Sequence, residues 1–494
     1  MTTAQGLSDQ PYTWVGLTVV LIDLTLRLVA LGVIPGNRKP STGMAWLLLI
    51  LVLPIPGFGV FLLFGSARVG RRRHELQRQV NALIIERSGQ FSQPIGDDAP
   101  AYLHSVVTLN DRLGALPLVA GNDVTVEPGY TASIAAMAEA VDGSREFVHV
   151  EFYITAWDEV TAPLLEAMTR AAERGVKVRL LFDHLGSRGI PGYRDLKARL
   201  AATQIEWYPM LPIMPLRRRF RRPDLRNHRK ILVVDGTVGF AGSQNLTEPG
   251  YNKPKNQKLG RSWVELMVRL EGPVVAELDA VFVGDWYAET SELLEVTGHR
   301  APSRPSGDPV REVRCQVVPS GPGYESENNL RLFTTLIYAA QSRVSLASPY
   351  FVPDESLLYA VTTAAQRGIE IELFVSEISD QFMVGHAQAS YYRALLEAGV
   401  RIYQYPAPYI LHAKHFTIDD DVAVIGSSNM DMRSFGLNYE VSLMMLGSPV
   451  VAEFRAVEDD YRKISTELTL AAWKQRPARL KFVDNVMRLT AALQ

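Results

Sequence analysis

The chain contains 494 residues, carries a formal net charge of −2 and is 47% hydrophobic. This length exceeds what one ordinary hydrophobic core holds, so two or three domains are expected. The near-neutral charge excludes a whole-molecule field that attracts nucleic acid or anionic lipid. The single cysteine, Cys315, excludes an intrachain disulfide and a cysteine-based zinc site, and it fits a reducing compartment.

Two apolar runs open the chain. Residues 15–34 contain only Asp23 and Arg27 as charges, and residues 44–64 contain none. Each run is long enough to cross the hydrocarbon core of a bilayer. No basic segment precedes the first run, as a secretory signal peptide would require. We therefore predict a membrane hairpin over residues 1–70, against the alternative of a buried helix pair in a soluble protein.

Within this hairpin the sequence predicts three local features. Asp23 and Arg27 are four residues apart, so they would share one helix face and could pair. The second run should be kinked, and could be re-entrant, because it contains Pro54, Pro56, Gly57 and Gly59. The arginines that follow the second run outnumber the basic residues of the connecting loop, Arg38 and Lys39; they are Arg68, Arg71, Arg72 and Arg73. The positive-inside rule then places the rest of the chain in the cytoplasm, with these arginines near anionic head groups.

After a helical linker expected over residues 71–120, the chain repeats itself. Residues 164–180 match residues 357–373, and each copy has the pattern of a helix, a glycine stop and an alternating strand. A further strand is expected before each copy, at residues 147–154 and 344–352. The repeat predicts two α/β domains, each a mixed sheet flanked by helices. The Pro- and Ser-rich stretch near residue 305 divides them into domains 121–305 and 306–494.

The motif His-x-Lys-x4-Asp-x6-Gly-Ser-x-Asn occurs once in each half, with identical spacing. Its first copy consists of His228, Lys230, Asp235, Gly242, Ser243 and Asn245. Its second copy consists of His412, Lys414, Asp419, Gly426, Ser427 and Asn429. In the first copy, residues 231–234 and 238–241 should form a hairpin joined at Asp235-Gly236. His228 and Lys230 then point to the same face of a strand, and the glycine allows close backbone approach.

This combination of side chains predicts phosphodiester chemistry without a metal. Displacement at phosphorus needs a nucleophile and a separate acid for the leaving oxygen, and two histidines with pKa values near neutrality supply both. The lysines and asparagines would bind the non-bridging oxygens, with Ser243 and Ser427 as further donors. A carboxylate beside each histidine would fix its tautomer, and the candidates are Glu265, downstream of His228, and Glu440, downstream of His412.

Other assignments of these residues are weaker. A metal site through His412 and His415 lacks a helix, a cysteine and a second pair of ligands nearby. Asp235 and Asp419 belong to the motif, but both lie at turns, where aspartate commonly makes local hydrogen bonds. They are therefore expected to support the site more than to react.

The paired motif resembles that of the phospholipase D superfamily. The resemblance to bacterial cardiolipin synthases covers essentially the whole chain and rests on the N-terminal apolar runs and on residues 226–230, 350–354 and 429–434. It implies two similar domains whose motifs meet at their interface, no cofactor, and condensation of two phosphatidylglycerol molecules to cardiolipin and glycerol. It further implies that His228 is the nucleophile and His412 the general acid and base, with a phosphatidyl-histidine intermediate.

Two segments favour a lipid substrate. An apolar stretch, residues 207–216, leads into basic residues that could hold anionic head groups, namely Arg217, Arg218, Arg219, Arg221 and Arg222. A solvated basic loop beside a core strand is the alternative. Residues 473–493 alternate apolar and basic residues at helical spacing, and we expect a packing helix there in preference to one lying on a membrane.

The expected protein is therefore a multi-pass enzyme of the bacterial plasma membrane that acts on phosphatidylglycerol and not on nucleic acid. A phospholipase D that transfers the phosphatidyl group to water shares the same residues and differs only in its product. A nuclease of the superfamily would cleave DNA, and the membrane segment argues against it. A non-catalytic scaffold would be expected to carry a degenerate motif. The oligomeric state is left open.

Overall fold

The computed structural model describes residues 11–36, 40–65, 79, 95–96, 99–213, 222–295, 312–324 and 326–491. The chain forms two compact units, Met1–Ala67 and Arg68–Gln494, and each is described here by itself. In the predicted linker over residues 71–120, most positions before residue 99 lie outside the described residues. The boundary expected between the two halves, near residue 305, also lies outside them.

The first unit contains three helices, α1 (Pro11–Val33), α2 (Pro40–Val52) and α3 (Pro54–Phe64). Trp14–Val33 is long and apolar enough to cross a membrane, as the sequence predicted for the first run. The second run is not one continuous helix: it breaks at Leu53, where the prolines of residues 54 and 56 begin α3. The predicted kink is confirmed, and the prediction of a two-span hairpin is supported only for its first helix.

Two contacts organise this unit. Arg27 and Asp23 form the expected ion pair on one helix face, with 2.9 Å between Arg27 Nε and Asp23 Oδ2. Helix α3 packs on α2 so closely that a Cβ at Gly57 would lie 2.9 Å from the carbonyl oxygen of Leu49. A glycine is therefore required at that contact.

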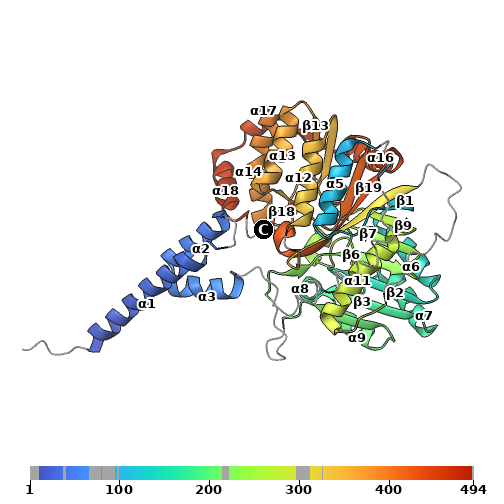
Figure 1. Cartoon of the computed structure of the whole chain (residues 1–494), viewed down its shortest axis with the longest axis horizontal. Coiled ribbons are helices and arrows are strands. Elements are labelled where there is room, and N and C mark those ends of the chain that lie inside the picture. The colour runs from blue at the N-terminus through green and yellow to red at the C-terminus, as the bar shows by residue number, and fades with distance from the viewer. Residues whose placement is uncertain are drawn as a thin grey trace, which may run out of the picture. The chain divides into compact units, whose positions relative to one another are not determined.

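The second unit is built on one continuous mixed sheet, as the duplicated α/β pattern predicted (Figure 1). Its strand order along the main path is β20-β14-β13-β11-β16-β17-β19-β10-β1-β9-β7-β6-β2-β3-β4. The first-half strands are β1 (Val119–Glu127), β2 (Phe147–Phe152), β3 (Lys177–Asp183), β4 (Glu206–Met210), β5 (Arg226–Asn227), β6 (Lys230–Val234), β7 (Val238–Gly242), β8 (Trp263–Val264) and β9 (Met267–Glu271). The second-half strands are β10 (Val313–Ser320), β11 (Arg343–Ala347), β12 (Phe351–Val352), β13 (Glu370–Ser376), β14 (Arg401–Tyr405), β15 (Ile410–Leu411), β16 (His415–Ile418), β17 (Val422–Gly426), β18 (Met430–Asp431), β19 (Asn438–Leu446) and β20 (Thr466–Leu468).

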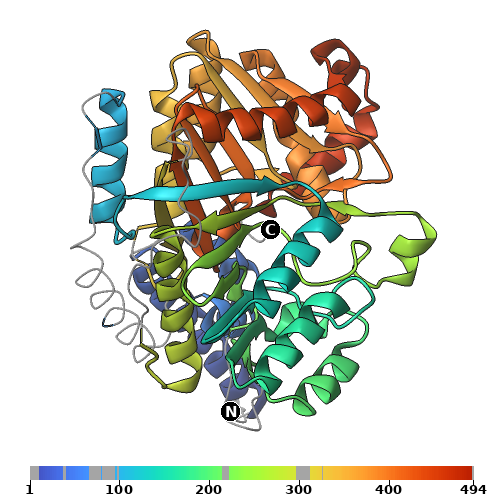
Figure 2. The ribbon, with the colours of Figure 1, turned by 90° about the vertical axis from the view of Figure 1, so that its right-hand side faces the viewer.

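The order of strands shows the duplication directly. From the centre outward, the first half runs β1-β9-β7-β6-β2-β3-β4 and the second runs β10-β19-β17-β16-β11-β13-β14. The halves join where β1 pairs antiparallel with β10, and Figure 2 shows β1 crossing the molecule between them. The hairpin predicted at the first motif is confirmed as β6 and β7, with Asp235 and Gly236 both at positive φ in the turn.

Helices cover both faces of this sheet. Helix α5 (Ala101–Arg112) precedes the first half and packs against the core of the second half. The helices of the first half are α6 (Tyr130–Asp142), α7 (Ala162–Glu173), α8 (His184–Arg188), α9 (Tyr193–Ala201), α10 (Pro254–Lys258) and α11 (Val274–Thr290). Those of the second half are α12 (Asn328–Ala339), α13 (Glu355–Gln366), α14 (Phe382–Ala398), α15 (Met432–Gly436), α16 (Ser448–Ile464), α17 (Leu470–Lys474) and α18 (Ala478–Arg488). Helices α11 and α16 share one apolar core with strands of both halves, so burial of nonpolar surface fixes one half against the other.

Candidate active site

Two very short parallel strand pairs connect the halves and position the motif histidines. Strand β5 of the first half pairs with the start of β19 in the second, and β15 of the second half pairs with β8 of the first. The backbone N–H of His228, the residue after β5, donates to Tyr439 O at 2.9 Å. The backbone N–H of His412, the residue after β15, donates to Val264 O at 2.7 Å. Each histidine is therefore held on a strand of the opposite half.

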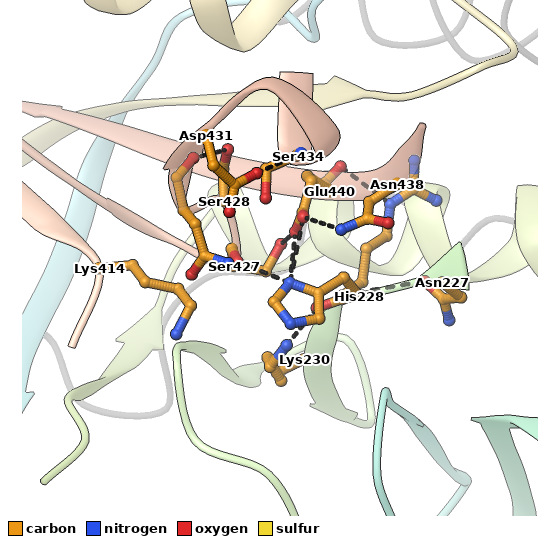
Figure 3. A network of polar contacts seen from close by, with 12 residues as sticks. Asn227, His228, Lys230, Lys414, Ser427, Ser428, Asp431, Ser434, Asn438 and Glu440 are labelled. Atoms are coloured by element: carbon orange, nitrogen blue, oxygen red, sulfur yellow. Dashed lines mark hydrogen bonds and ion pairs between the residues drawn. The ribbon is translucent and has the colours of Figure 1, made fainter. Parts of the chain in front are cut away.

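This exchange decides which carboxylate each histidine meets. His228 Nδ1 lies 3.1 Å from both carboxylate oxygens of Glu440 and 2.9 Å from Ser427 O (Figure 3). His412 Nδ1 lies 2.6 Å from Glu265 Oε1. The sequence order had suggested that each glutamate serves the histidine of its own half, but the structure shows the opposite pairing. The cause is the strand register, which places Glu440 opposite His228 and Glu265 opposite His412.

The motif serines hold these glutamates. Ser243 Oγ donates to Glu265 Oε2 at 2.5 Å and accepts the N–H of Leu266 at 3.0 Å. Ser427 Oγ donates to Glu440 Oε2 and accepts the N–H of Val441 at 3.0 Å. Since each hydroxyl proton is directed at a carboxylate, the serines orient the glutamates and do not face a ligand.

The motif glycines make room for this contact. A Cβ at Gly242 would lie 2.4 Å from Leu266 O, and one at Gly426 would lie 2.2 Å from Val441 O. No side chain fits at either distance, so both strands can approach the glutamate-bearing strands only through glycine. The close approach inferred from the sequence at Gly242 is confirmed.

Both motif lysines are buried beside the histidines. Lys230 Nζ donates to the carbonyl oxygen of His228, and Lys414 Nζ donates to that of His412 at 2.7 Å. Lys414 Nζ also lies 3.3 Å from His412 Nε2. Burial lowers the pKa of Lys230 to about 7 and that of Lys414 to about 8. A bound phosphate anion favours the charged ammonium, so it raises both pKa values again.

The two histidines differ in their electrostatic surroundings. Burial lowers the pKa of His228 well below its usual value, and the nearby Lys230 and Lys414 lower it further. Burial also lowers the pKa of His412, but there the negative charge of Glu265 opposes the shift. Burial raises the pKa of Glu440 to about 7. Both histidines are therefore favoured in the neutral form, His228 more strongly, whereas His412 has the shorter contact to a carboxylate that stabilises its protonated form.

The asparagines and three tyrosines complete the surroundings. Asn245 Nδ2 donates to Tyr251 Oη at 2.9 Å, and its Oδ1 accepts the N–H of Ile154. The Tyr153 ring packs edge-on against the His228 ring at 4.8 Å, and the Tyr350 ring does the same against His412 at 6.3 Å. Asn429 in the second half is buried, and its Oδ1 has no hydrogen-bond partner among the described residues.

The motif aspartates lie at the opposite end of the hairpins from the histidines. Asp235 accepts the backbone N–H groups of residues 145, 146 and 147 at 2.8 to 2.9 Å, where β2 begins. Asp419 accepts the N–H groups of residues 341, 342 and 343 at 2.7 to 2.9 Å, where β11 begins. These hydrogen bonds join the motif hairpin to its neighbouring strand, which fits the supporting role expected from the turns.

Sequence reasoning missed a buried polar cluster behind His228. Arg229, between the motif histidine and lysine, is 1% exposed and forms an ion pair with Asp285 of α11. Its Nε donates to the carbonyl oxygen of Glu440 at 3.0 Å, so it holds the backbone of the residue that contacts His228. Glu151, from β2, lies in the same cluster and accepts from Asn227 at 2.9 Å. An arginine inside a motif on a buried strand was the available signal, since an unpaired charge is not tolerated there.

The basic loop is only partly visible. Residues 214–221 lie outside the described residues, and with them Arg217, Arg218, Arg219 and Arg221. Arg222 is described: its Nε donates to Asp224 Oδ1 at 3.0 Å, so its guanidinium is already paired within the chain.

Comparison with known proteins agrees with this geometry. A family model described as "Cardiolipin synthase, PLD-like domain" matches residues 137–286 and 333–459, which contain both motifs. The chain belongs to the cardiolipin synthase family. Among curated relatives of this family, Cardiolipin synthase A of Proteus mirabilis (strain HI4320) is 32% identical over 451 residues, 89% of this chain and 90% of the relative. Cardiolipin synthase A of Serratia proteamaculans (strain 568) is 31% identical over 471 residues, 94% of this chain and 95% of the relative.

A solved structure shows the same fold at greater distance. The phosphatidylserine synthase of Haemophilus influenzae Rd KW20 superimposes with a TM-score of 0.59 over 80% of this chain and 100% of that one, at 15% sequence identity. The duplicated sheet is therefore shared between this cardiolipin synthase family member and a more distant protein. The N-terminal apolar helix α1 lies outside the two segments matched by the family model.

Proposed function

We propose that this enzyme transfers a phosphatidyl group from one phosphatidylglycerol to a second, forming cardiolipin and glycerol. The observation that carries the proposal is the pair of histidines, each held at Nδ1 by a glutamate of the opposite half. Membership of the cardiolipin synthase family supports the substrate, and a helix long enough to span a bilayer supports access to it.

In the first step, His228 Nε2 attacks the phosphorus of the donor lipid. Its Nδ1 proton points to Ser427 O and Glu440, which leaves the lone pair on Nε2, and its lowered pKa keeps the ring neutral. The bond from phosphorus to the glycerol oxygen breaks while His412 donates a proton to that oxygen. Glu265 at 2.6 Å stabilises the charged form of His412 that this step requires.

In the second step, His412 takes the proton from the terminal hydroxyl of the acceptor phosphatidylglycerol. The hydroxyl oxygen attacks phosphorus, the bond between phosphorus and His228 Nε2 breaks, and both histidines return to their starting states. Lys230 and Lys414 bind the non-bridging oxygens and stabilise the charge of the five-coordinate transition state. Asn245 and Asn429 assist them, whereas Asp235 and Asp419 act only through the strands that they join.

We also propose that the catalytic unit lies in the cytoplasm. The support is the excess of arginines over residues 68–73 compared with the two basic residues of the loop between the apolar runs. No oligomeric partner is needed for this chemistry, because one chain supplies both histidines and both glutamates.

The test is incubation of the purified full-length protein with phosphatidylglycerol and identification of the lipid products by mass spectrometry. Cardiolipin and free glycerol are expected, and both His228→Ala and His412→Ala should lose about 10⁴-fold in turnover. The matched control is His104→Ala, which removes an exposed histidine of α5. Phosphatidic acid as the main product would overturn the transferase assignment in favour of hydrolysis, and unchanged turnover in both active-site variants would overturn the mechanism.

A further inference from the structure

Helix α18 carries an exposed apolar stripe that the fold does not use. Phe482, Val486 and Leu489 recur at a spacing of four and three residues, which places them on one side of the helix and its end. Their side chains are 70%, 38% and 85% exposed. The opposite side of the helix packs on α14, with Asp484 buried and Met487 against the apolar core. The packing helix expected from the sequence is therefore present, and its other face carries exposed apolar side chains.

The charges beside the stripe are of one sign. Arg479 and Lys481 lie on the exposed part of α18, whereas the Arg488 guanidinium lies over the Tyr391 ring of α14, 4.5 Å from its centroid. The only acidic residue of the helix, Asp484, points inward, where His386 Nδ1 and Arg476 each lie 2.7 Å from its carboxylate. The outward face thus combines apolar and cationic side chains, although the chain as a whole carries a net charge of −2. This pairing of properties is typical of a helix that lies in the interface of an anionic bilayer.

The start of α14 extends this surface. Phe382 and Met383 are 68% and 43% exposed. The Phe382 ring lies edge-on to the His386 ring at 4.4 Å, and His386 bonds to Asp484, so the start of α14 is joined to α18 by direct contacts. We define Phe382, Met383, Phe482, Val486 and Leu489 as the apolar rim.

The start of α14 connects the apolar rim to the active site through side-chain contacts. Gln381, the residue before Phe382, donates to Tyr350 Oη at 3.0 Å. Tyr350 in turn donates to Asp380 at 2.8 Å, and its ring packs against His412. Gln381 and Tyr350 therefore connect the chain beside Phe382 to His412, the histidine that donates a proton to the leaving glycerol.

We propose that the apolar rim and the flanking cations of α18 form a membrane-docking surface that seats the catalytic unit on an anionic bilayer beside its active site. This inference deepens the proposed function and rests on its lipid substrate. The occupant is a bilayer surface because the outward charges of α18 are all basic, and because the same chain carries an apolar helix long enough to anchor it to a membrane. That tether gives even a weak surface contact a high effective concentration.

The direct test is depth measurement on the full-length protein in nanodiscs of phosphatidylglycerol. An environment-sensitive fluorophore is attached at Leu489→Cys or Phe482→Cys; the native Cys315 is 0% exposed and does not compete for the label. Nitroxide-bearing lipids should quench both probes, at least about five-fold more than a probe at Glu173→Cys, an exposed position at the end of α7 in the other half. Equal quenching at positions 489 and 173 would overturn the proposal.

Two further arms identify the occupant. Quenching at position 489 should fall when phosphatidylglycerol is replaced by phosphatidylcholine, and in Arg479→Glu/Lys481→Glu; insensitivity to both would overturn the anionic part of the proposal. A pyrene label at position 489 should give monomer emission only, whereas excimer emission would show that a second copy of the chain covers the rim and would overturn a bilayer occupant.

The activity arm separates docking from chemistry. Phe482→Ser/Leu489→Ser should lower turnover of phosphatidylglycerol in vesicles by about five-fold or more, while turnover of a short-chain, monomeric phosphatidylglycerol stays within about two-fold of the unaltered enzyme. An equal loss on both substrates would contradict a docking role. Quenching without any cardiolipin formation would leave the docking surface standing and reject the proposed function.

Discussion

The two halves of the catalytic unit place one motif in two different surroundings. In each, a histidine follows a two-residue strand that pairs with the opposite half, and a serine at the end of a strand orients a glutamate. The residue between histidine and lysine differs: it is Arg229 in the first half, paired with Asp285, and Ala413 in the second. The shared parts supply the geometry, whereas the electrostatics differ: Lys230 and Lys414 lower the pKa of His228, and Glu265 opposes the lowering of the pKa of His412.

The comparison also shows that neither half is a complete site. His228 without the second half would lose both Glu440 and Ser427 O, and His412 without the first half would lose Glu265. Duplication followed by exchange of short strands therefore assembles each histidine with a glutamate of the opposite half. A symmetric pair with its own glutamates inside each half would not require the halves to be joined in one sheet.

Among changes to the residues that surround the two histidines, the largest effect is expected from exchanging each glutamate for its amide. Glu440→Gln and Glu265→Gln should each lower turnover by about 10² to 10³, because a histidine loses the carboxylate that orients it and stabilises its charge. A p-nitrophenyl phosphatidyl ester has a leaving group that needs no proton. With this donor, the first step, in which the phosphatidyl group moves to the histidine, should recover in Glu265→Gln but not in Glu440→Gln. Pre-steady-state release of p-nitrophenol measures this step.

The matched control for both variants is Glu173→Gln, at an exposed glutamate on α7. The opposite pattern, with recovery in Glu440→Gln, would mean that His228 and Glu440 supply the proton to the leaving group, and it would contradict the assignment of His228 as the nucleophile.

The buried Arg229–Asp285 ion pair should stabilise the fold in the first half, whereas the second half has Ala413 at the matching position. Arg229 and Asp285 are 1% and 0% exposed, so Arg229→Ala leaves an uncompensated buried carboxylate and should cost about 3–5 kcal/mol of unfolding free energy. The double variant Arg229→Met/Asp285→Leu should lose less than the single one, because no buried charge is left unpaired. Denaturant unfolding in detergent, followed by circular dichroism, measures both. A loss below about 1 kcal/mol in Arg229→Ala would show that the pair is not needed.

The buried lysines predict a basic limb in the pH profile. The folded-state pKa is about 7 for Lys230 and about 8 for Lys414, both below the usual lysine value. Below these pKa values the ammonium groups are charged and bind phosphate, so kcat/KM should fall as pH rises through 7 to 8, by about ten-fold per unit beyond the pKa of one essential group. The fall in kcat should occur at higher pH than the fall in kcat/KM, because bound phosphate raises both lysine pKa values. Equal limbs for the two parameters, or a flat profile from about pH 6 to 9, would contradict this.

The smallest effects are expected at the serines. Ser243→Ala and Ser427→Ala each remove one hydrogen bond to a carboxylate, which is worth roughly 1.5–3 kcal/mol and corresponds to about ten-fold or more in turnover. The leaving-group test distinguishes them: Ser243→Ala should behave like Glu265→Gln, and Ser427→Ala like Glu440→Gln. If both serine variants responded alike to the p-nitrophenyl ester, the division of labour between the halves would be wrong.

Local features of the fold followed from the sequence. The turn at Asp235-Gly236 predicted the β6–β7 hairpin, the repeated helix-to-strand pattern predicted two α/β halves, and Pro54 predicted the break in the second apolar run. Each of these rests on residues close together in the chain, where backbone geometry and side-chain periodicity decide the outcome.

The exchange of glutamates did not follow from the sequence. It depends on β5–β19 and β8–β15, pairs of only two residues each between segments far apart in the chain, too short to show any periodicity. The Arg229–Asp285 pair likewise joins the segment between β5 and β6 to a helix 56 residues away. The apolar stripe of α18 was visible at helical spacing, but only the packing of its other face on α14 shows which side stays exposed.

The most direct test of the account is to locate the covalent intermediate. Enzyme mixed with phosphatidylglycerol is quenched in acid-free denaturant within one turnover, digested and analysed by tandem mass spectrometry. A phosphatidyl group is expected on His228 Nε2, absent in His228→Ala and retained in His412→Ala when the p-nitrophenyl ester is the donor. A phosphatidyl group on His412, with none on His228, would contradict the assignment of a neutral nucleophile beside Glu440 and an acid beside Glu265.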